Sequence, residues 1–482
     1  MRFARQKIHF MGIGGIGMSA LAGLARERGA TVSGCDAAAN PRALAQAGVE
    51  IQTGHSPAHV ANVDLLVHTA AVPSDHPEII AAKRAMRRGE FLAAALADDE
   101  VIGVAGAHGK TTTTLMIAQI FLAAGKDPTV LLGGISPQLR GNYRCGGRLD
   151  GARFDGARLD GGRFDGARLD VARLAVAELD ESDGAFLLPR LAVGVITNVE
   201  PEHLAYYRDF AKVVAAFQQF ADQILPENFL VANLDNAAAA EIFHRRSGNK
   251  IGYGKNAAGG WHWRERRCGD GDQCATIFRG EREIGALRLP FIGEHNLVNA
   301  LAALAVADIY AVAPDAALAA LAVCAGAERR WEKLGEWGGA AIFSDYAHHP
   351  TEIRATLTGA RENYRGKMLV VFQPHLFSRT RDLADEFAAA LTGADQVILT
   401  DIYPAREAPI AGVTAALISD AIPPEKLAAP APLPLAAAVA LARTMADAFA
   451  VVVFMGAGDL DEGARRDFAG RRAPTASSRC GL

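Results

Sequence analysis

Short apolar runs alternate with amphipathic stretches along most of the chain, a pattern typical of strands that are each followed by a helix. In the first segment, residues 7–13 (KIHFMGI) predict a buried strand and residues 18–29 an amphipathic helix. Residues 31–36 and 63–72 predict two more strands before the alternation fades near Leu96. This order indicates a parallel sheet with crossover helices.

The same pattern restarts twice. Residues 101–125 (VIGVAGAHGKTTTTLMIAQIFLAAG) predict a strand, a glycine turn and a helix. Later strands of this second segment are expected at 172–180, 192–200 and 228–235. The third segment begins near Trp337 and predicts four strands, at 340–347, 368–374, 396–404 and 449–458. The two joins are placed near 97–100 and 325–330, and three domains also agree with the length of 482 residues.

Residues 147–176 follow neither the helical nor the strand pattern of apolar positions. They contain six pentads of a small residue, Arg, Leu or Phe, usually Asp, and Gly or Val. A helix repeats every 3.6 residues and a strand every two, so a period of five cannot keep the apolar side chains on one face of either element. The pentads resemble the pentapeptide-repeat β-helix, but six give only about one and a half coils, and stacked repeats need several units to bury a core. We expect a solvated surface loop, because each doubling of loop length costs only about 0.6 kcal/mol.

Composition narrows the class of protein. Half of the residues are hydrophobic and 22% are charged, which excludes disorder of the whole chain. The net charge of −4 gives no signature of nucleic-acid binding. No run of 18 uncharged apolar residues occurs, so no membrane segment is expected, and the six cysteines are too scattered for a disulfide framework. We expect a cytoplasmic protein, a monomer or a homodimer, that acts on small molecules.

Two glycine-rich loops carry the chemistry of the first two segments. Gly12, Gly14 and Gly17 form GxGxxG between a strand and a helix, and Asp36 follows at the end of the next strand, which favours a diphosphate ligand. Residues 106–111 (GAHGKT) form a shortened P-loop after a buried strand. Its backbone N–H groups are expected to hold phosphates, with Lys110 at the β/γ-phosphates and Thr111 at Mg²⁺.

Two further strand ends suit a divalent cation. Acidic residues at 178, 180, 181 and 183 cluster after one strand, and His203 follows another. Carboxylates and an imidazole near a P-loop suit Mg²⁺ that bridges nucleotide and substrate. In the third segment, DYAHHPTE and FQPHLFSRTR come directly after strands and are expected to contact anions, and Arg329 and Arg330 lie at the second join.

These motifs together resemble the Mur ligase family. The resemblance lies in HFMGIGGIGMS, GAHGKTTTT, ELDESD, TNVEPEH, GEHNLVNA, GAERRWEKLGE, SDYAHHPTEI, FQPHLFSRTRD, YPAREAPI and FMGAGD, in family order from Lys7 to about Gly458. It implies an α/β protein of three domains: a Rossmann-like domain for a UDP-sugar (1–98), a central P-loop ATPase domain with a mostly parallel sheet (99–325), and a Rossmann-like ligase domain (326–482). Within the family, the motifs favour the alanine-adding activity, in which ATP phosphorylates the lactyl carboxylate of UDP-N-acetylmuramate and L-alanine attacks the acyl phosphate.

The resemblance also implies roles for individual residues. The UDP-substrate site would comprise Gly12, Ile13, Gly14, Gly15, Ile16, Gly17, Asp36 and Thr69. The ATP site would comprise Gly106, His108, Gly109, Lys110, Thr111, Thr112, Asn296, Asn299, Arg330 and Asp345. The Mg²⁺ ligands would be Thr111, Glu178 and His203, and the catalytic residues Lys110, Glu178, His203 and Arg330. The amino-acid pocket would comprise Tyr346, His348, His375 and Arg379.

Three positions depart from the family pattern. Glu202 stands where the family usually has Asp, Ala205 replaces an acid two positions after the histidine, and Leu376 stands where many members have Arg. Two alternatives to the alanine-adding activity remain: a recycling ligase that joins a whole murein tripeptide to the same UDP-sugar, and a non-catalytic nucleotide-binding protein that uses the pentads as a docking surface. A dehydrogenase that uses NAD would leave the second phosphate loop unexplained.

Overall fold

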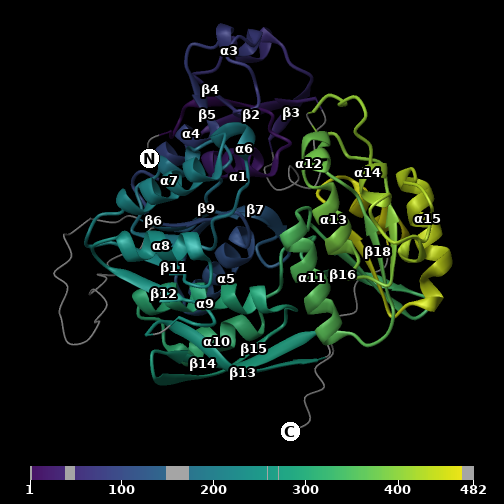
Figure 1. Cartoon of the computed structure of the whole chain (residues 1–482). Helices are drawn as coiled ribbons and strands as arrows, with labels where there is room; N and C mark the ends of the chain where they lie inside the picture. Colours follow the sequence, from purple (N-terminus) through teal and green to yellow (C-terminus); the bar gives the residue numbers. More distant parts are fainter. Residues whose placement is uncertain are drawn as a thin grey trace. The chain divides into compact units, whose positions relative to one another are not determined.

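The computed structural model describes residues 3–37, 49–147, 173–257, 259–269, 271–405 and 407–468. The pentads lie outside the described residues, apart from the few positions at their two ends. Within the described ranges the chain forms three sheets, of five, ten and five strands, connected largely by helices (Figure 1). The expected α/β architecture is therefore confirmed, and no described helix is long and apolar enough to cross a membrane.

The chain divides into two compact units. The first comprises Met1–Arg267, Cys274–Pro290 and His295–Ala327, and therefore carries the first sheet and nearly all of the second. The second unit comprises Cys268–Gln273, Phe291–Glu294 and Glu328–Leu482, and it carries the third sheet.

The first sheet is parallel, in the order β3-β2-β1-β4-β5. Its strands are β1 (Lys7–Met11), β2 (Thr31–Asp36), β3 (Glu50–Thr53), β4 (Leu65–His68) and β5 (Ala85–Arg87). Its helices are α1 (Ile16–Glu27), η1 (Pro57–Val60), α3 (Pro77–Ala81) and α4 (Arg88–Ala95). Three of the strands match the sequence prediction. The pattern missed β3 and β5, which are short and mostly exposed and so lack a clear apolar period.

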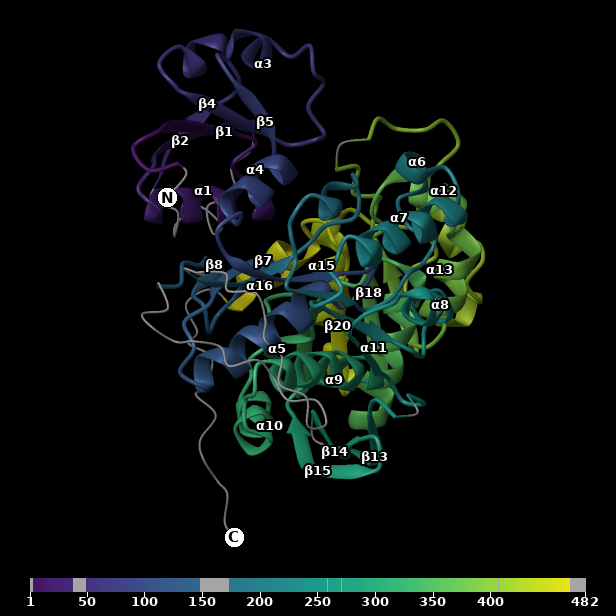
Figure 2. The same cartoon turned by 90° about the vertical axis from the view of Figure 1, so that its left-hand side faces the viewer.

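Successive residues of a strand face opposite sides of the sheet, and this divides the first sheet into two layers. Ile8 and Phe10 of β1 belong to the main core, which includes residues of α1 and α4. Met11 belongs to a smaller core on the other face, with Cys35, Leu66 and residues of η1 and α3. Figures 1 and 2 both show α3 on the side of the sheet opposite α1 and α4.

The second sheet has the order β15-β14-β13-β12-β11-β10-β6-β9-β7-β8. Its strands are β6 (Glu100–Ala105), β7 (Thr129–Ser136), β8 (Gly141–Arg144), β9 (Leu174–Glu178), β10 (Val193–Ile196), β11 (Phe229–Asn233), β12 (Lys250–Tyr253), β13 (Trp261–Gly269), β14 (Asp272–Arg279) and β15 (Arg282–Leu289). Strands β6, β7, β9, β10, β11 and β12 pair in parallel, and β8 runs antiparallel to β7. β9, which begins within the last pentad, lies in the sheet between β6 and β7.

The helices around this sheet include two that are buried on nearly all sides. They are α5 (Lys110–Ala123) and α9 (Glu294–Ile309), which carry apolar or small residues all round, as expected for helices inside a core. The others are η2 (Ala185–Leu187), α6 (Leu204–Tyr207), α7 (Phe210–Asp222), α8 (Ala237–Arg245) and α10 (Pro314–Ala322). α7 is amphipathic, and the Asp209 side chain caps it by accepting from the Lys212 N–H.

Buried polar contacts join the first sheet to the second within the first unit. The Arg28 guanidinium donates to the Asp99 carboxylate, whose side chain is only 1% exposed. The Asn142 amide on β8 donates to the Ile16 carbonyl in the first turn of α1, at 2.6 Å. A Cβ on Gly23 of α1 would lie 2.2 Å from the Tyr143 ring, so a glycine is needed for this close approach.

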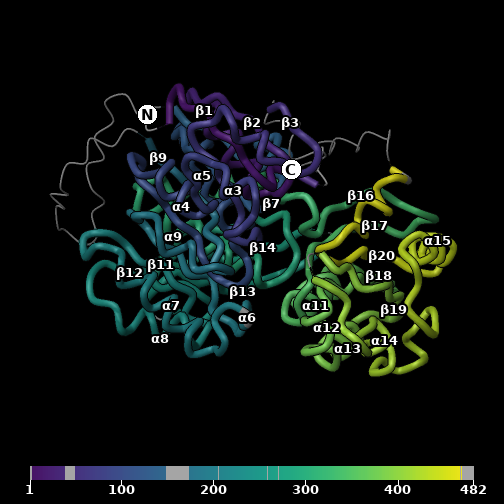
Figure 3. The backbone as a smooth tube through the Cα atoms, turned by 90° about the horizontal axis from the view of Figure 1, so that it is seen from above, coloured from purple at the N-terminus to yellow at the C-terminus, as the bar shows by residue number. Residues whose placement is uncertain are grey.

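The third sheet has the order β16-β17-β20-β18-β19, parallel except for the β16–β17 pair (Figure 3). Its strands are β16 (Glu332–Trp337), β17 (Ala340–Asp345), β18 (Met368–Phe372), β19 (Gln396–Leu399) and β20 (Val451–Met455). Its helices are α11 (Pro350–Asn363), α12 (Phe377–Asp382), α13 (Ala384–Leu391), α14 (Ala416–Ser419), η3 (Pro424–Lys426), α15 (Leu435–Met445), η4 (Ala446–Ala448), α16 (Leu460–Arg465) and η5 (Arg466–Phe468).

Alternate residues of β18 pack on opposite faces of this sheet. Val370 and Phe372 face a core shared with α11 and α13, whereas Leu369 and Val371 face a second core shared with α15 and α16. A parallel strand covered on both faces needs a continuous apolar run, which is why MLVVF predicted it so clearly. All four strands predicted for this segment are present as β17, β18, β19 and β20.

Candidate active site

The glycine loop between β1 and α1 is supported by the end of β2. The N–H groups of Gly12 and Ile13 donate to the Cys35 carbonyl, at 2.8 and 3.2 Å. The Gly14 N–H donates to the Asp36 carboxylate at 2.7 Å. Gly12 has a φ of 80°, and a Cβ there would lie 3.1 Å from the Thr69 methyl group. The structure therefore brings Asp36 and Thr69 to the loop, with Asp36 holding its backbone.

The start of α1 lies beside a charged pair that the sequence pattern did not reveal. Gly15 is the N-cap of α1, Ile16 begins the helix, and a Cβ on Gly17 would lie 2.7 Å from an Arg88 guanidinium nitrogen. Another nitrogen of Arg88 donates to the Asp180 carboxylate at 2.7 Å. Arg88 therefore connects the glycine loop with the acidic strand end of the second sheet.

The P-loop joins β6 to α5 and takes its shape from two left-handed glycines. Gly106 and Gly109 have φ values of 138° and 83°, which L-residues with side chains rarely adopt. The Thr197 hydroxyl donates to the His108 carbonyl at 2.6 Å, and the Asn198 side chain both accepts from the His108 N–H and donates to its carbonyl. The end of β10 thus fixes the loop that precedes Lys110.

Both predicted asparagines lie beside this loop. A Cβ on Gly109 would lie 2.5 Å from the Asn299 side-chain oxygen, and the Asn299 amide donates to the Asn296 side chain at 3.3 Å. Thr111 and Thr112 occupy the first turn of α5, where helical N–H groups have no intrahelical partner. This combination of glycines, helix N-terminus and amides is suited to a polyphosphate.

Lys110 lies at the centre of a charged network. Its ammonium donates to the carbonyls of Gly106 and Ala107 and to both oxygens of Glu181, at 3.1 and 2.9 Å. Burial alone would lower the pKa of Lys110, but Glu181 and the neighbouring carboxylates Asp180 and Glu178 raise it above its ordinary value. The ammonium is thus charged at neutral pH, as phosphate neutralisation requires.

Three donors of a kind suited to a divalent cation gather next to Lys110. Glu181, Glu202 and His203 offer ligand atoms that all lie within 4.8 Å of one another. The His203 imidazole is 3.4 Å from Glu181 and 3.6 Å from Glu202, and His203 itself has a φ of 56°. Glu202, one of the three positions singled out from the sequence as departures, is therefore a member of this group.

Glu178 is held in a different way from Glu181. Its carboxylate accepts from the Gly133 N–H at 2.7 Å, and it belongs to none of the three-donor groups found among the described residues. The resemblance selected Glu178 from the acidic run, whereas the structure brings Glu181 into contact with both Lys110 and His203. The sequence pattern placed Glu181 in the acidic cluster, but it could not show which acid of the cluster contacts Lys110.

In the second unit, Arg330 lies in a strained segment. Its neighbours Arg329 and Trp331 have φ values of 60° and 50°. The guanidinium of Arg330 lies 5.0 Å from the centre of the Tyr346 ring and pairs at 3.7 Å with Glu352. Glu352 was not singled out from the sequence, although it belongs to the DYAHHPTEI motif.

Asp345 is the last residue of β17, and its carboxylate is hydrogen-bonded to the backbone of the second unit. Its two carboxylate oxygens accept from the backbone N–H groups of Trp331 and Ala347, at 2.8 and 2.9 Å. Burial raises the pKa of this carboxyl, although Arg330 opposes the shift.

The four residues of the expected amino-acid pocket come from the loop after β17, the loop after β18 and the helix α12 of the second unit. The rings of Tyr346 and His348 are 5.1 Å apart, and those of His348 and His375 are 5.9 Å apart. Arg379 carries a buried guanidinium nitrogen that has no hydrogen-bond partner in the part of the chain that the structure describes. An orphaned cationic donor beside two imidazoles suits a carboxylate ligand. Leu376, which lies between His375 and α12, has a φ of 73°.

We expect the second unit to lose stability in acid, because His348 is buried as a neutral imidazole. Burial lowers its pKa to about 3; Glu352 and the Tyr346 carbonyl raise it, whereas Arg379 and His375 lower it further. Between pH 6.5 and about 3 the unfolded chain therefore binds a proton that the folded unit does not, and stability falls as the pH is lowered.

Replacement of His348 by Asn is expected to reduce this pH dependence. The slope of the unfolding free energy against pH, measured by urea denaturation from pH 7 to pH 5, should become shallower by up to about 1.4 kcal/mol per pH unit. The exposed His244 gives the matched control, since His244→Asn should keep the wild-type slope. An unchanged slope in His348→Asn would contradict the assignment.

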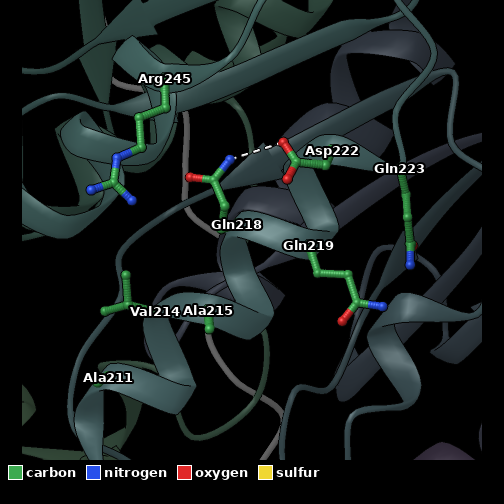
Figure 4. Close-up of a pocket in the computed structure, with 8 residues that line it drawn as sticks. All are labelled: Ala211, Val214, Ala215, Gln218, Gln219, Asp222, Gln223 and Arg245. Carbon is green, nitrogen blue, oxygen red and sulfur yellow. Dashed lines mark hydrogen bonds between the residues drawn. The ribbon is translucent and has the colours of Figure 1, made fainter.

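The first unit also has a hollow of about 490 Å³ between α7 and the end of α8 (Figure 4). It is lined by Ala211, Val214, Ala215, Gln218, Gln219, Asp222, Gln223 and Arg245. The Gln218 side-chain N–H donates to Asp222 at 2.9 Å, whereas its buried side-chain oxygen has no hydrogen-bond partner among the described residues. None of the predicted site residues line this hollow.

Three family domains match the chain in order. Residues 7–98 match the Mur ligase family catalytic domain, residues 163–307 the Mur ligase middle domain, and residues 329–458 the Mur ligase glutamate ligase domain. The chain is 41% identical to the UDP-N-acetylmuramate–L-alanine ligase of Renibacterium salmoninarum over 86% of each chain. It is 38% identical to the ligase of the same name from Aquifex aeolicus, over 95% of this chain and 96% of the relative.

Solved structures resemble the chain over almost its full length. The UDP-N-acetylmuramate–alanine ligase from Thermotoga maritima superimposes with a TM-score of 0.76 at 28% identity, covering 96% of this chain and 98% of that one. A murein peptide ligase from Psychrobacter arcticus superimposes with a TM-score of 0.67 at 24% identity, covering 98% of this chain and 100% of that one, which is a likeness of fold.

Proposed function

Because the chain belongs to the Mur ligase family, we propose that it joins L-alanine to the lactyl carboxylate of UDP-N-acetylmuramate with ATP as the energy source. The products are UDP-N-acetylmuramoyl-L-alanine, ADP and phosphate, and the reaction belongs to the synthesis of peptidoglycan precursors. The chain is 38–41% identical to UDP-N-acetylmuramate–L-alanine ligases over 84–95% of its length, and this observation carries the proposal.

The central site supports an activation by phosphoryl transfer. A carboxylate is a poor electrophile, and its phosphorylation supplies a leaving group when cations stabilise the charge on the transferred phosphoryl group. Lys110 provides a buried cation at the end of the P-loop, and the first turn of α5 provides N–H donors. We assign ATP to this loop and to Asn296 and Asn299. The roles of Arg330 and Asp345 at the nucleotide stay predictions.

The donor set next to Lys110 fits Mg²⁺. Hard divalent cations prefer carboxylate and hydroxyl oxygens, and Glu181, Glu202 and His203 already lie together. We propose that Thr111, Glu178 and His203 hold Mg²⁺, with Glu181 and Glu202 as further donors in contact with His203. When bound, Mg²⁺ would neutralise the negative charge of the phosphates, and the Lys110 ammonium would neutralise it from the side of the P-loop.

The UDP-sugar is assigned to the N-terminal domain and L-alanine to the C-terminal domain. We propose that the diphosphate of the UDP-sugar binds the loop Gly12–Gly17, whose backbone is fixed by Cys35 and Asp36. The carboxylate of L-alanine is assigned to Arg379, because one of its buried guanidinium nitrogens has no hydrogen-bond partner among the described residues and its charge acts on His348. Tyr346 and His375 are assigned to the same pocket, because their rings lie 5.1 and 5.9 Å from that of His348. The domain bounds 1–98, 99–325 and 326–482, a cytoplasmic location and a monomer or homodimer stay predictions.

Phosphate release tests the proposed reaction. Protein is mixed with ATP, Mg²⁺, UDP-N-acetylmuramate and L-alanine, and each component is omitted in turn. Release that requires all four components, with formation of the alanyl product by mass spectrometry, is the expected result.

The alternatives are separated by two changes to this assay. Product formed with a murein tripeptide in place of alanine, and none with alanine, would assign the recycling reaction. Folded protein that binds ATP but releases no phosphate with either amine would support the non-catalytic alternative and overturn the proposal.

A further inference from the structure

A compact group of metal-ligand side chains lies in the first sheet, on the face that carries η1 and α3. His9 is next to Met11 in the period-two pattern of β1, so both face the smaller core rather than α1 and α4. Cys35 comes from β2, His59 from η1 and Glu78 from α3. These four side chains therefore converge from four elements on one side of the sheet. Figure 2 shows α3 on this side.

The four side chains are close enough to share one ion. Their donor atoms all lie within 4.8 Å of one another. The Glu78 carboxylate lies 2.8 Å from the His59 Nδ1 and 3.5 Å from the Cys35 Sγ. Zn²⁺ binds sulfur at about 2.3 Å and imidazole nitrogen at about 2.1 Å, so donors up to about 4.4 Å apart reach a common ion and small rotations complete the set.

The group contains a buried nitrogen for which no partner exists among the described residues. His9 is fully buried, its Nδ1 lies 2.9 Å from the Ser33 hydroxyl, and its Nε2 has no hydrogen-bond partner. Such a group costs about 1–3 kcal/mol unless something binds it. Zinc-bound histidines are oriented in this way, with one ring nitrogen held by an outer partner and the other directed at the metal.

We propose that His9, Cys35, His59 and Glu78 form a closed zinc site that stabilises the first sheet. The donor set is one thiolate, two imidazoles and one carboxylate, which matches the preference of Zn²⁺ for four protein ligands in a structural site. The two anionic ligands balance the charge of the ion, so that a neutral group is buried.

The charges around the group favour this assignment at Glu78 and His9, whereas burial and the Glu78 carboxylate raise the pKa of the Cys35 thiol to about 12, so zinc must displace its proton on binding. Burial raises the pKa of Glu78, but the Ser56 N–H, His59 and Cys35 lower it below its ordinary value, so a carboxylate is retained in the core. Burial lowers the pKa of His9 to about 4 and leaves its imidazole neutral, as ligation requires. His55 lies at the exposed side, with its Nδ1 3.3 Å from the Cys35 Sγ.

The site would act on the UDP-sugar domain through the main chain of β2. The Cys35 carbonyl accepts from Gly12 and Ile13, and Asp36 accepts from Gly14. An ion that fixes Cys35 therefore fixes the backbone that supports the glycine loop. The ion is structural, because all four positions of a tetrahedral zinc would be occupied by protein.

Cobalt substitution tests the site through a signal that only a cysteine ligand gives. The full chain, stripped with a chelator and kept in excess Mg²⁺ without nucleotide, is titrated with Co²⁺. A thiolate-to-cobalt charge-transfer band that saturates at about one equivalent per chain is expected. The group of Glu181, Glu202 and His203 contains no cysteine and cannot produce this band.

Variants assign the band to its ligands. Cys35→Ser should abolish it, whereas Cys324→Ser, a change at another buried cysteine of the same unit, should retain it. His59 is partly exposed, so His59→Asn should fold and bind zinc at least about 10–100-fold more weakly in competition with a chelating dye. A wild-type chain without the band, or a band that persists in Cys35→Ser, would overturn the proposal. If Cys35→Ser fails to fold, unchanged zinc affinity in His59→Asn would overturn it instead.

Discussion

Replacement of Gly106 by alanine is expected to destabilise the first unit by about 3 kcal/mol or more and to abolish ATP-dependent phosphate release. Gly106 has a φ of 138°, which alanine adopts only under strain. A Cβ would lie 2.0 Å from the Thr197 hydroxyl and 2.9 Å from the Asn198 carbonyl. Thr197 cannot move away without losing its bonds to Ala105 and His108, so strain and overpacking add. Urea denaturation measures the loss of stability.

Gly125 provides a matched control at the other end of α5. Its φ is 72°, and a Cβ there would meet no atom of the described residues within 4 Å. Gly125→Ala therefore isolates the backbone strain, which we expect to cost about 1–2 kcal/mol with phosphate release retained. Equal losses of stability in the two variants would show that the contact with Thr197 has no part in the effect.

Replacement of Lys110 by methionine is expected to lower kcat by about 10²–10³-fold. Methionine keeps the apolar stem but removes the charge that the β/γ-phosphates need in the transition state. The change also removes one partner of the buried Glu181 carboxylate, which keeps its contact with His203. Phosphate release at saturating substrates measures kcat, and thermal unfolding reports the loss of the ion pair separately.

Lys212 gives the corresponding control at an exposed ion pair. It lies 3.3 Å from Asp209, and both side chains are more than half exposed. Lys212→Met should change stability by less than about 1 kcal/mol and leave kcat unaltered. A Lys110→Met enzyme with kcat within tenfold of the wild type would contradict the role given to Lys110.

Several buried parallel strands could be predicted because they are almost fully apolar, whereas the buried parallel strands β7 and β12 were missed. β6, β10 and β18 are covered on both faces, and each appears in the sequence as a continuous run. The strands β3, β5 and β13 have mixed or exposed patterns, and residues 50–53 carry little that distinguishes them from a loop. β16 pairs antiparallel at a sheet edge and reads as a polar segment.

The candidate site could be predicted where a loop follows a strand, because glycines and charged residues there have a fixed spacing. The P-loop, His203 and DYAHHPTE were found in this way. Contacts between distant segments could not be found: Arg88 reaches Asp180 across 92 residues, and Asn198 reaches His108 across 90. The choice of Glu181 over Glu178 as the partner of Lys110 depends on side-chain direction after β9, which spacing alone does not give.

The polar contacts between Arg28 and Asp99 and between Asn142 and α1 have a consequence for cooperativity. Removing the first sheet from the second would leave these buried groups without partners, at about 1–3 kcal/mol each and more for the charges. The first two sheets are therefore expected to melt in a single transition. Partial proteolysis should accordingly release a fragment that ends near Ala327, in preference to one that ends near Ala97.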